Sequence, residues 1–204
     1  IYTGEDTLSL HDALPICSSN QILFVGRLVE KKGLRHLIDA MPAIRAARPD
    51  VILTIAGFGP DEQALREHAE RLGLGACVQF LGARRQDQLP ALYRHAAVFV
   101  APFVEARGGD QEGLGLVVIE AAGCHCPVVV SRVPANAALL AQAPELAAVP
   151  PGDPNALVVA VLAQLQRGSV PVPRSLQTFD WAERARSYAA LLHAVASTPA
   201  RDAH

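Results

Sequence analysis

Five short apolar runs alternate with amphipathic segments along the first two thirds of this chain. The runs are ILFVG (22–26), VILTIAG (51–57), CVQFLG (77–82), AVFVAP (97–102) and PVVVS (127–131). They are nearly continuous in apolar residues, as is typical of strands buried on both faces of a sheet. The pattern predicts a parallel sheet covered by helices.

The segments between the runs have helical periodicity. Five apolar residues after the first run share one stripe: Leu34, Leu37, Ile38, Met41 and Ile44. Pro60 with Asp61 predicts the start of a second helix and Gly73 its end, and a later helix is expected over 156–166. Alternating strands and helices predict an α/β fold, a doubly wound parallel sheet of Rossmann-like type.

Composition narrows the class of protein. The 204 residues are 50% hydrophobic and 19% charged, which is a globular composition, and the net charge of -2 provides no basic field for nucleic acid. No apolar run approaches the roughly 20 residues of a membrane helix, and no secretory signal is visible, so a cytoplasmic protein is expected. The four cysteines have no disulfide-framework spacing, and Cys124-His125-Cys126 supplies too few ligands for a zinc site.

Three segments are expected. Residues 1–20 contain GEDTLSLHDALPI, which resembles translated sequencing-adapter DNA, and they are excluded from the domain as artefact or linker. Residues 21–170 are expected to form the Rossmann-like domain. A linker and a C-terminal helix with Trp181 on its apolar face are expected over 171–204.

Ligands of open α/β sheets bind at the carboxyl ends of the strands, so the loops after the strands hold the candidate site. The loop GRLVEKKG (26–33) carries Arg27 and Lys32, which could bind a diphosphate, although two solvated loop charges would look the same. The loop AGFGPD (56–61) contains a Gly-x-Gly step that permits close approach of a ligand or simply forms a turn.

The stretch QEGLGLVVIEAAG (111–123) places two carboxylates at the ends of an apolar segment. Gly113 and Gly115 lie at the beginning of an expected helix, whose first N–H groups favour a phosphate, and Glu112 precedes that helix. Glu112 and Glu120 would be about 12 Å apart if the whole segment were helical. That separation suits a nucleotide sugar, with Glu112 on the hexose and Glu120 on the ribose, whereas Glu120 could instead pair with an arginine.

Together GRLVEKKG, AGFGPD, FLG and EGLGLVVIE resemble the donor half of family 4 retaining glycosyltransferases, from about Gln21 to the terminal helix. The resemblance implies the C-terminal half of a two-Rossmann-domain (GT-B) enzyme. It assigns catalysis to Arg27, Lys32 and Glu112, and donor binding to Gly26, Leu81, Gly82, Arg84, Gly113, Leu114, Gly115, Leu116 and Glu120. Within that set, the base would lie near Leu81 to Arg84.

The resemblance also implies the reaction and its partners. The donor is a nucleoside diphosphate sugar, the configuration is retained, and neither metal nor cofactor is expected. The acceptor, whether saccharide, lipid-linked sugar or small molecule, would bind mainly to an N-terminal domain outside this sequence, so the chain alone should bind donor but scarcely turn it over. Membrane association is expected only through parts outside this sequence.

Two stretches depart from the family pattern. VPANAALL (133–140) stands where many members have Gly-Gly-x-Pro-Glu, which puts in doubt a role of this region in donor binding. EARGGD (105–110) is expected to be an extended loop whose Glu105, Arg107 and Asp110 could contact an acceptor.

Other functions stay open. The chain could be a nucleotide-binding module without catalysis, or a nucleotide-sugar epimerase of the same fold. A sugar phosphorylase would need a lysine-bound pyridoxal cofactor for which no motif is visible. An NAD-dependent dehydrogenase is disfavoured because GRLVEKKG, not G-x-G-x-x-G, follows the first strand.

Overall fold

The computed structural model describes residues 20–113 and 115–167. The predictions for residues 1–19, for Leu114 and for 168–204, including the C-terminal helix, lie outside the described residues.

Six parallel strands form one sheet in the order β3-β2-β1-β4-β5-β6. They are β1 (Gln21–Val25), β2 (Ile52–Ala56), β3 (Val78–Gly82), β4 (Val98–Ala101), β5 (Val128–Ser131) and β6 (Ala147–Val149). Ile22 pairs with Leu53 of β2 on one side and with Val98 of β4 on the other. The strand order reverses between β1 and β4, which is where ligands bind in doubly wound sheets. The predicted fold class is confirmed.

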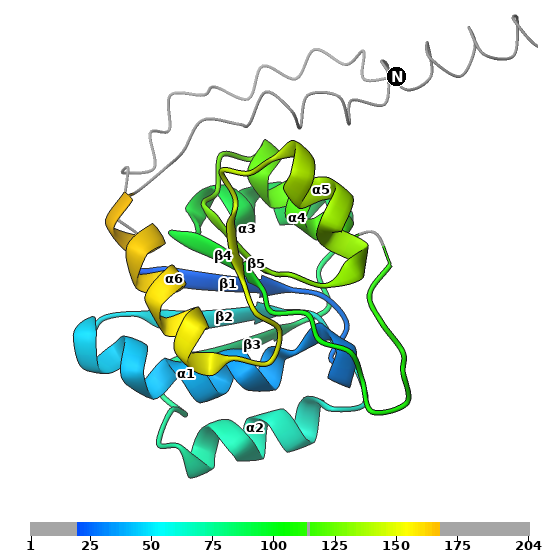
Figure 1. Cartoon of the computed structure of the whole chain (residues 1–204). Coiled ribbons are helices and arrows are strands. Elements are labelled where there is room, and N and C mark those ends of the chain that lie inside the picture. Colours follow the sequence, from blue (N-terminus) through cyan, green and yellow to red (C-terminus); the bar gives the residue numbers. More distant parts are fainter. Residues whose placement is uncertain (1–19, 114, 168–204) are drawn as a thin grey trace, which may run out of the picture.

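Helices cover both faces of the sheet (Figure 1). The first face carries α1 (Leu34–Ala47), α2 (Glu62–Arg71) and α6 (Pro154–Arg167), and the second carries α3 (Leu89–His95), α4 (Leu116–Gly123) and α5 (Ala137–Gln142). Three single 3₁₀ turns, η1 (Glu30–Lys32), η2 (Gln86–Gln88) and η3 (Pro134–Asn136), lie in the connections. None of the helices within the described ranges is long and apolar enough to cross a membrane.

The hydrophobic core has two parts, one on each face. In β1, Ile22 and Phe24 belong to the cluster under α1, α2 and α6, whereas Leu23 and Val25 belong to the cluster under α3 and α4. Successive side chains of a strand point to opposite faces, so an entirely apolar strand fits only a sheet covered on both sides. Because helices pack on both faces of the sheet, the strand ends and the loops that follow them are held in place.

Sequence periodicity did not predict β6 or α5. VPANAALL, which departs from the family pattern, forms η3 and the start of α5. Both missed elements are short, with 3 and 6 residues, so their periodicity is weak.

Candidate functional site

Glycines end three neighbouring strands and leave the carboxyl edge of the sheet open. Gly26 N–H donates to Ala56 O at 3.0 Å, and Gly57 N–H donates to Gly82 O at 2.9 Å, so the three loops leave the sheet in register. A Cβ on Gly57 would lie 1.8 Å from Gly26 O, which only glycine avoids. The Gly-x-Gly step at 57–59 therefore has a structural reason, independent of any ligand.

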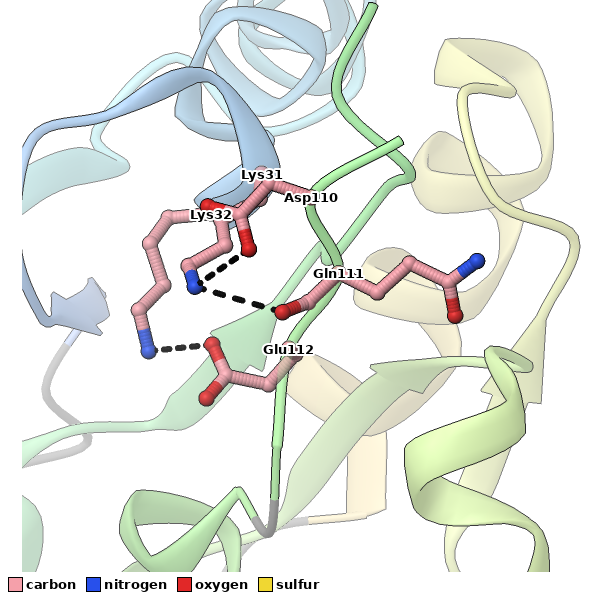
Figure 2. Close-up of polar contacts among 5 residues, drawn as sticks. All are labelled: Lys31, Lys32, Asp110, Gln111 and Glu112. Carbon is pink, nitrogen blue, oxygen red and sulfur yellow. Dashed lines mark hydrogen bonds and ion pairs between the residues drawn. The ribbon is translucent and has the colours of Figure 1, made fainter. Parts of the chain in front are cut away.

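Lys32 and Glu112 come together across this edge from loops 80 residues apart in the sequence. Lys32 Nζ lies 2.5 Å from Glu112 Oε2, and their side chains are only 14% and 11% exposed (Figure 2). The contact is an ion pair without hydrogen-bond geometry. Lys32 Nζ also lies 5.0 Å from the centre of the Phe103 ring, a favourable cation–π position. An ammonium has three N–H groups, so Lys32 can bind another anion besides Glu112.

Arg27 is exposed and lies in the same loop as Lys32, directly after Gly26. Its side chain has no hydrogen-bond or ion-pair partner within the described part of the chain. The Lys32 side chain passes close to Gly26, where a Cβ would lie 3.6 Å from Lys32 Cδ. The predicted cation pair is thus available at one strand end, with Arg27 open to solvent.

A small cavity of about 160 Å³ continues from Arg27 across the ends of β1, β2 and β3. Its lining includes the predicted residues Gly26, Arg27 and Arg84, but not Leu81 or Gly82. It also includes Phe58, whose side chain is 61% exposed and which the sequence reading overlooked. An exposed aromatic residue between two glycines of AGFGPD was the available signal.

Glu120 lies on α4 and is held by uncharged donors. Tyr93 of α3 donates its hydroxyl to Glu120 Oε2 at 3.0 Å, and Gln86 of η2 donates to Oε1 at 2.9 Å. Burial and the neighbouring Glu120 charge raise the pKa of Tyr93 far above its usual value, so the hydroxyl stays protonated as a donor. No arginine pairs with Glu120 among residues 20–113 and 115–167.

The helix α4 begins later than predicted. Gly115 is its N-cap and Leu116 its first residue, so Gly113 precedes the helix and Glu112 belongs to the loop. The spacing of about 12 Å, which assumed a continuous helix, therefore does not apply. A Cβ on Gly115 would lie 2.9 Å from Phe103 and 3.3 Å from Asn136 Oδ1, so the backbone packs tightly there.

The side chains of EARGGD have intramolecular partners. Asp110 pairs with Lys31 at 3.0 Å, Arg107 lies 3.4 Å from Glu30, and Glu105 accepts from Gln111 Nε2 at 2.9 Å. Asp110 and Arg107 tie the loop to η1, and its contact with an acceptor stays a prediction.

A larger cavity of about 710 Å³ lies beside η1, between α1, α2 and the loops at Glu105 and Gly152. It contains none of the residues predicted to bind the donor. Its size alone does not make it the site, because the convergent cations and carboxylates lie at the sheet edge instead.

No group of three or more metal-ligating side chains occurs within the described ranges. Burial raises the pKa of the Cys126 thiol to about 12 and also raises that of Cys124, so both thiols stay protonated. Cys126 is buried in the cluster under α3 and α4, so packing accounts for this cysteine.

A family model described as "Glycosyl transferases group 1" matches residues 19–167. Over 112 residues the chain is 39% identical to the GDP-mannose-dependent alpha-(1-6)-phosphatidylinositol monomannoside mannosyltransferase of Mycolicibacterium smegmatis, covering 54% of this chain and 29% of that protein. The fold is similar to sucrose-phosphate synthase from Thermosynechococcus elongatus, with a TM-score of 0.74, 27% identity and coverage of 89% of this chain and 46% of that one. It is also similar to Anabaena HepE in complex with UDP, with a TM-score of 0.73, 23% identity and coverage of 94% and 54%. The chain thus spans less than a third of the mannosyltransferase and about half of each solved structure.

Proposed function

Because the chain belongs to the glycosyl transferases group 1 family, we propose that it is the donor-binding domain of a retaining glycosyltransferase that uses a nucleoside diphosphate sugar. The observation that carries the proposal is the meeting of Lys32 and Glu112 at the carboxyl edge of the sheet, 2.5 Å apart and largely buried. A cation and a carboxylate side by side can bind the two adjacent parts of such a donor, the diphosphate and the sugar.

The diphosphate would bind to Arg27 and Lys32. Arg27 offers an open guanidinium fork, and Lys32 has N–H groups that Glu112 does not occupy. In the transfer reaction the bond from the anomeric carbon to the diphosphate breaks, its electron pair leaves with the diphosphate, and the acceptor oxygen takes its place. Preorganised cations stabilise the charge that grows on this leaving group.

The sugar and the ribose would lie at the two carboxylates. Glu112 lies next to Lys32, so it would accept hydrogen bonds from the hexose. Glu120 would accept hydrogen bonds from the ribose. Both Glu120 oxygens already accept one hydrogen bond, yet a carboxylate has about four lone-pair sites, so ribose hydroxyls can still be accommodated. The backbone amides from Gly113 to Leu116 would complete the diphosphate site.

The base would occupy the small cavity lined by Gly26, Phe58 and Arg84. Phe58 offers an exposed aromatic face for stacking, and η2, which supplies Gln86 to Glu120, follows Arg84 closely along the chain. Leu81 and Gly82 would support the cavity from the end of β3. We propose that an N-terminal domain supplies the acceptor site, since related proteins extend well beyond this chain.

Calorimetric titration of the 204-residue chain with UDP, GDP and ADP tests the proposal. We expect one of them to bind preferentially, and Arg27→Ala to weaken that binding while leaving binding of the corresponding nucleoside unchanged. Arg35→Ala is the matched control, because Arg35 is an exposed arginine of α1 outside the proposed site. Failure of a folded chain to bind any of the three would contradict the proposal.

A further inference from the structure

The loop that carries Glu112 has no regular secondary structure at its described residues, 102–113 and 115. Most of its side chains from Glu105 to Gln111 are exposed, so packing alone does not fix it. We propose that Lys31 is the positioning residue for Glu112 and thereby sets the preference of the site for a sugar-bearing diphosphate over a bare one. This inference rests on the proposed function.

Lys31 holds both ends of the exposed stretch. Its carbonyl oxygen accepts from Val104 N–H at 3.0 Å, at the start of the loop. Its ammonium donates to Asp110 Oδ1 at 3.0 Å and to Gln111 O at 3.2 Å, at the residues immediately before Glu112 (Figure 2). One residue therefore fixes where the loop leaves the sheet and where it returns.

The stretch between these two attachments is closed on itself. Ala106 N–H donates to Asp110 O at 2.9 Å, and Gly109 N–H donates to Ala106 O at 2.8 Å. These hydrogen bonds hold the turn in one conformation. The Lys31 contacts at Asp110 and Gln111 therefore determine the position of Glu112.

Lys31 acts from a rigid base. Gly33, two residues on, has a left-handed φ of 66°, and a Cβ there would lie 1.8 Å from Pro102 O. The backbone of η1 thus rests directly on the end of β4. Lys31 and Lys32 are the only lysines in the 204-residue sequence, and their side chains reach successive parts of the same loop (Figure 2).

The two lysines have different tasks. Lys32 pairs with Glu112 directly, but a bound diphosphate would share that ammonium and weaken its hold on Glu112. The Lys31 ammonium is already engaged by Asp110 and Gln111, so its restraint persists when the donor binds. Loss of Lys31 should therefore affect the sugar contact and spare the diphosphate contact.

Calorimetric titrations with GDP and GDP-mannose, and with UDP and UDP-glucose, test this division of tasks. We expect Lys31→Met to weaken binding of the sugar-bearing donor about five-fold, which is the upper range for a partly exposed ion pair. Binding of the bare diphosphate should change less than about two-fold. Lys31→Arg should retain binding of the sugar-bearing donor, because a guanidinium can also donate hydrogen bonds to Asp110 and to the Gln111 carbonyl. Arg107→Met is the matched control: it removes a 95% exposed cation of the same loop that does not contact Asp110 or Gln111, and it should change neither ligand.

Hydrogen–deuterium exchange of the ligand-free chain supplies an independent readout. Amides from 110 to 113 should exchange faster in Lys31→Met and stay as in wild type in Arg107→Met. Unchanged exchange there, or equal loss of both ligands in Lys31→Met, would overturn the positioning role. If wild type binds none of the four ligands, the proposed function fails, and exchange alone then decides whether Lys31 positions Glu112.

Discussion

Glu112 and Glu120 lie eight residues apart in the sequence but are held by different physical means. Glu112 belongs to a loop and is paired with the charge of Lys32, whereas Glu120 belongs to a helix and accepts hydrogen bonds from the uncharged Gln86 and Tyr93. Removing Lys32 would leave a nearly buried carboxylate without its cation, whereas removing either Gln86 or Tyr93 would leave Glu120 with its other donor. Substitutions at the Glu112 end should therefore lower stability more than substitutions at the Glu120 end.

The largest effect is expected at the backbone under the Glu112 end. Gly33→Ala would force a side chain into the left-handed region and against Pro102 O, 1.8 Å from the new Cβ. We expect a loss of about 3 kcal/mol or more in the free energy of unfolding, measured by urea denaturation. Gly108→Ala is the control in the same part of the fold, since nothing lies within 4 Å of its Cβ position and it should cost little. Equal stability of the two variants would contradict the close packing of η1 on β4.

Breaking the ion pair should come next. Lys32→Met leaves the Glu112 carboxylate nearly buried without its cation, and we expect a loss of about 2–3 kcal/mol in unfolding free energy, below the full cost of a completely buried pair. Adding Glu112→Gln should recover much of that loss, because the unpaired charge disappears. A double variant no more stable than Lys32→Met would show that Lys32 stabilises through packing against Phe103 rather than through the pair.

The two carboxylates should also differ in which ligand they affect. Glu120→Ala should weaken binding of a bare nucleoside diphosphate by about 1.5–3 kcal/mol, as for loss of a charged hydrogen bond to the ribose. Glu112→Ala should leave the bare diphosphate at least as tightly bound and weaken only the sugar-bearing donor. Calorimetry with GDP against GDP-mannose and UDP against UDP-glucose measures both. Equal losses for the two ligands in either variant would refute the division of roles.

The strands were predictable from sequence because their signal is local. Five of the six strands are strongly apolar, and β1, β2, β4 and β5 are almost entirely buried, whereas β6 is the alanine-rich AAV and is only partly buried. The cations of GRLVEKKG and the carboxylate of Glu112 were likewise visible as motifs. Local periodicity carries such features, since it depends on residues that are neighbours in the chain.

The partners of these residues were not predictable for the opposite reason. Gln86 and Tyr93 reach Glu120 from 34 and 27 residues away, and only the order of the strands brings α3 beside α4. His68 shows the same limit: nothing in the sequence of α2 marks its partner, but it is 9% exposed and lies 2.5 Å from Asp39 of α1. A helical pattern describes a helix's own faces and not the neighbour that covers them.

The smallest effect is expected from Tyr93→Phe, at the better supported Glu120 end. The ring should stay in place, because it packs edge-on against Phe99 with centres 5.5 Å apart, so only the hydroxyl bond to Glu120 is lost. We expect a loss of about 1.5 kcal/mol in unfolding free energy, the lower end for a hydrogen bond to a charged group, with nucleotide binding weakened less than by Glu120→Ala because Gln86 still orients the carboxylate.

The pH dependence of this stability difference identifies the hydroxyl as its source. Because the pKa of Tyr93 is raised in the folded chain, the folded state keeps a proton that the unfolded state loses above about pH 10. Wild type should then lose stability that Tyr93→Phe does not, so the gap between them should be constant at neutral pH and narrow above about pH 10. A gap that stayed constant or widened there would mean that the tyrosinate is accepted beside Glu120, and the carboxylate would then be held by a mechanism other than a protonated neutral donor.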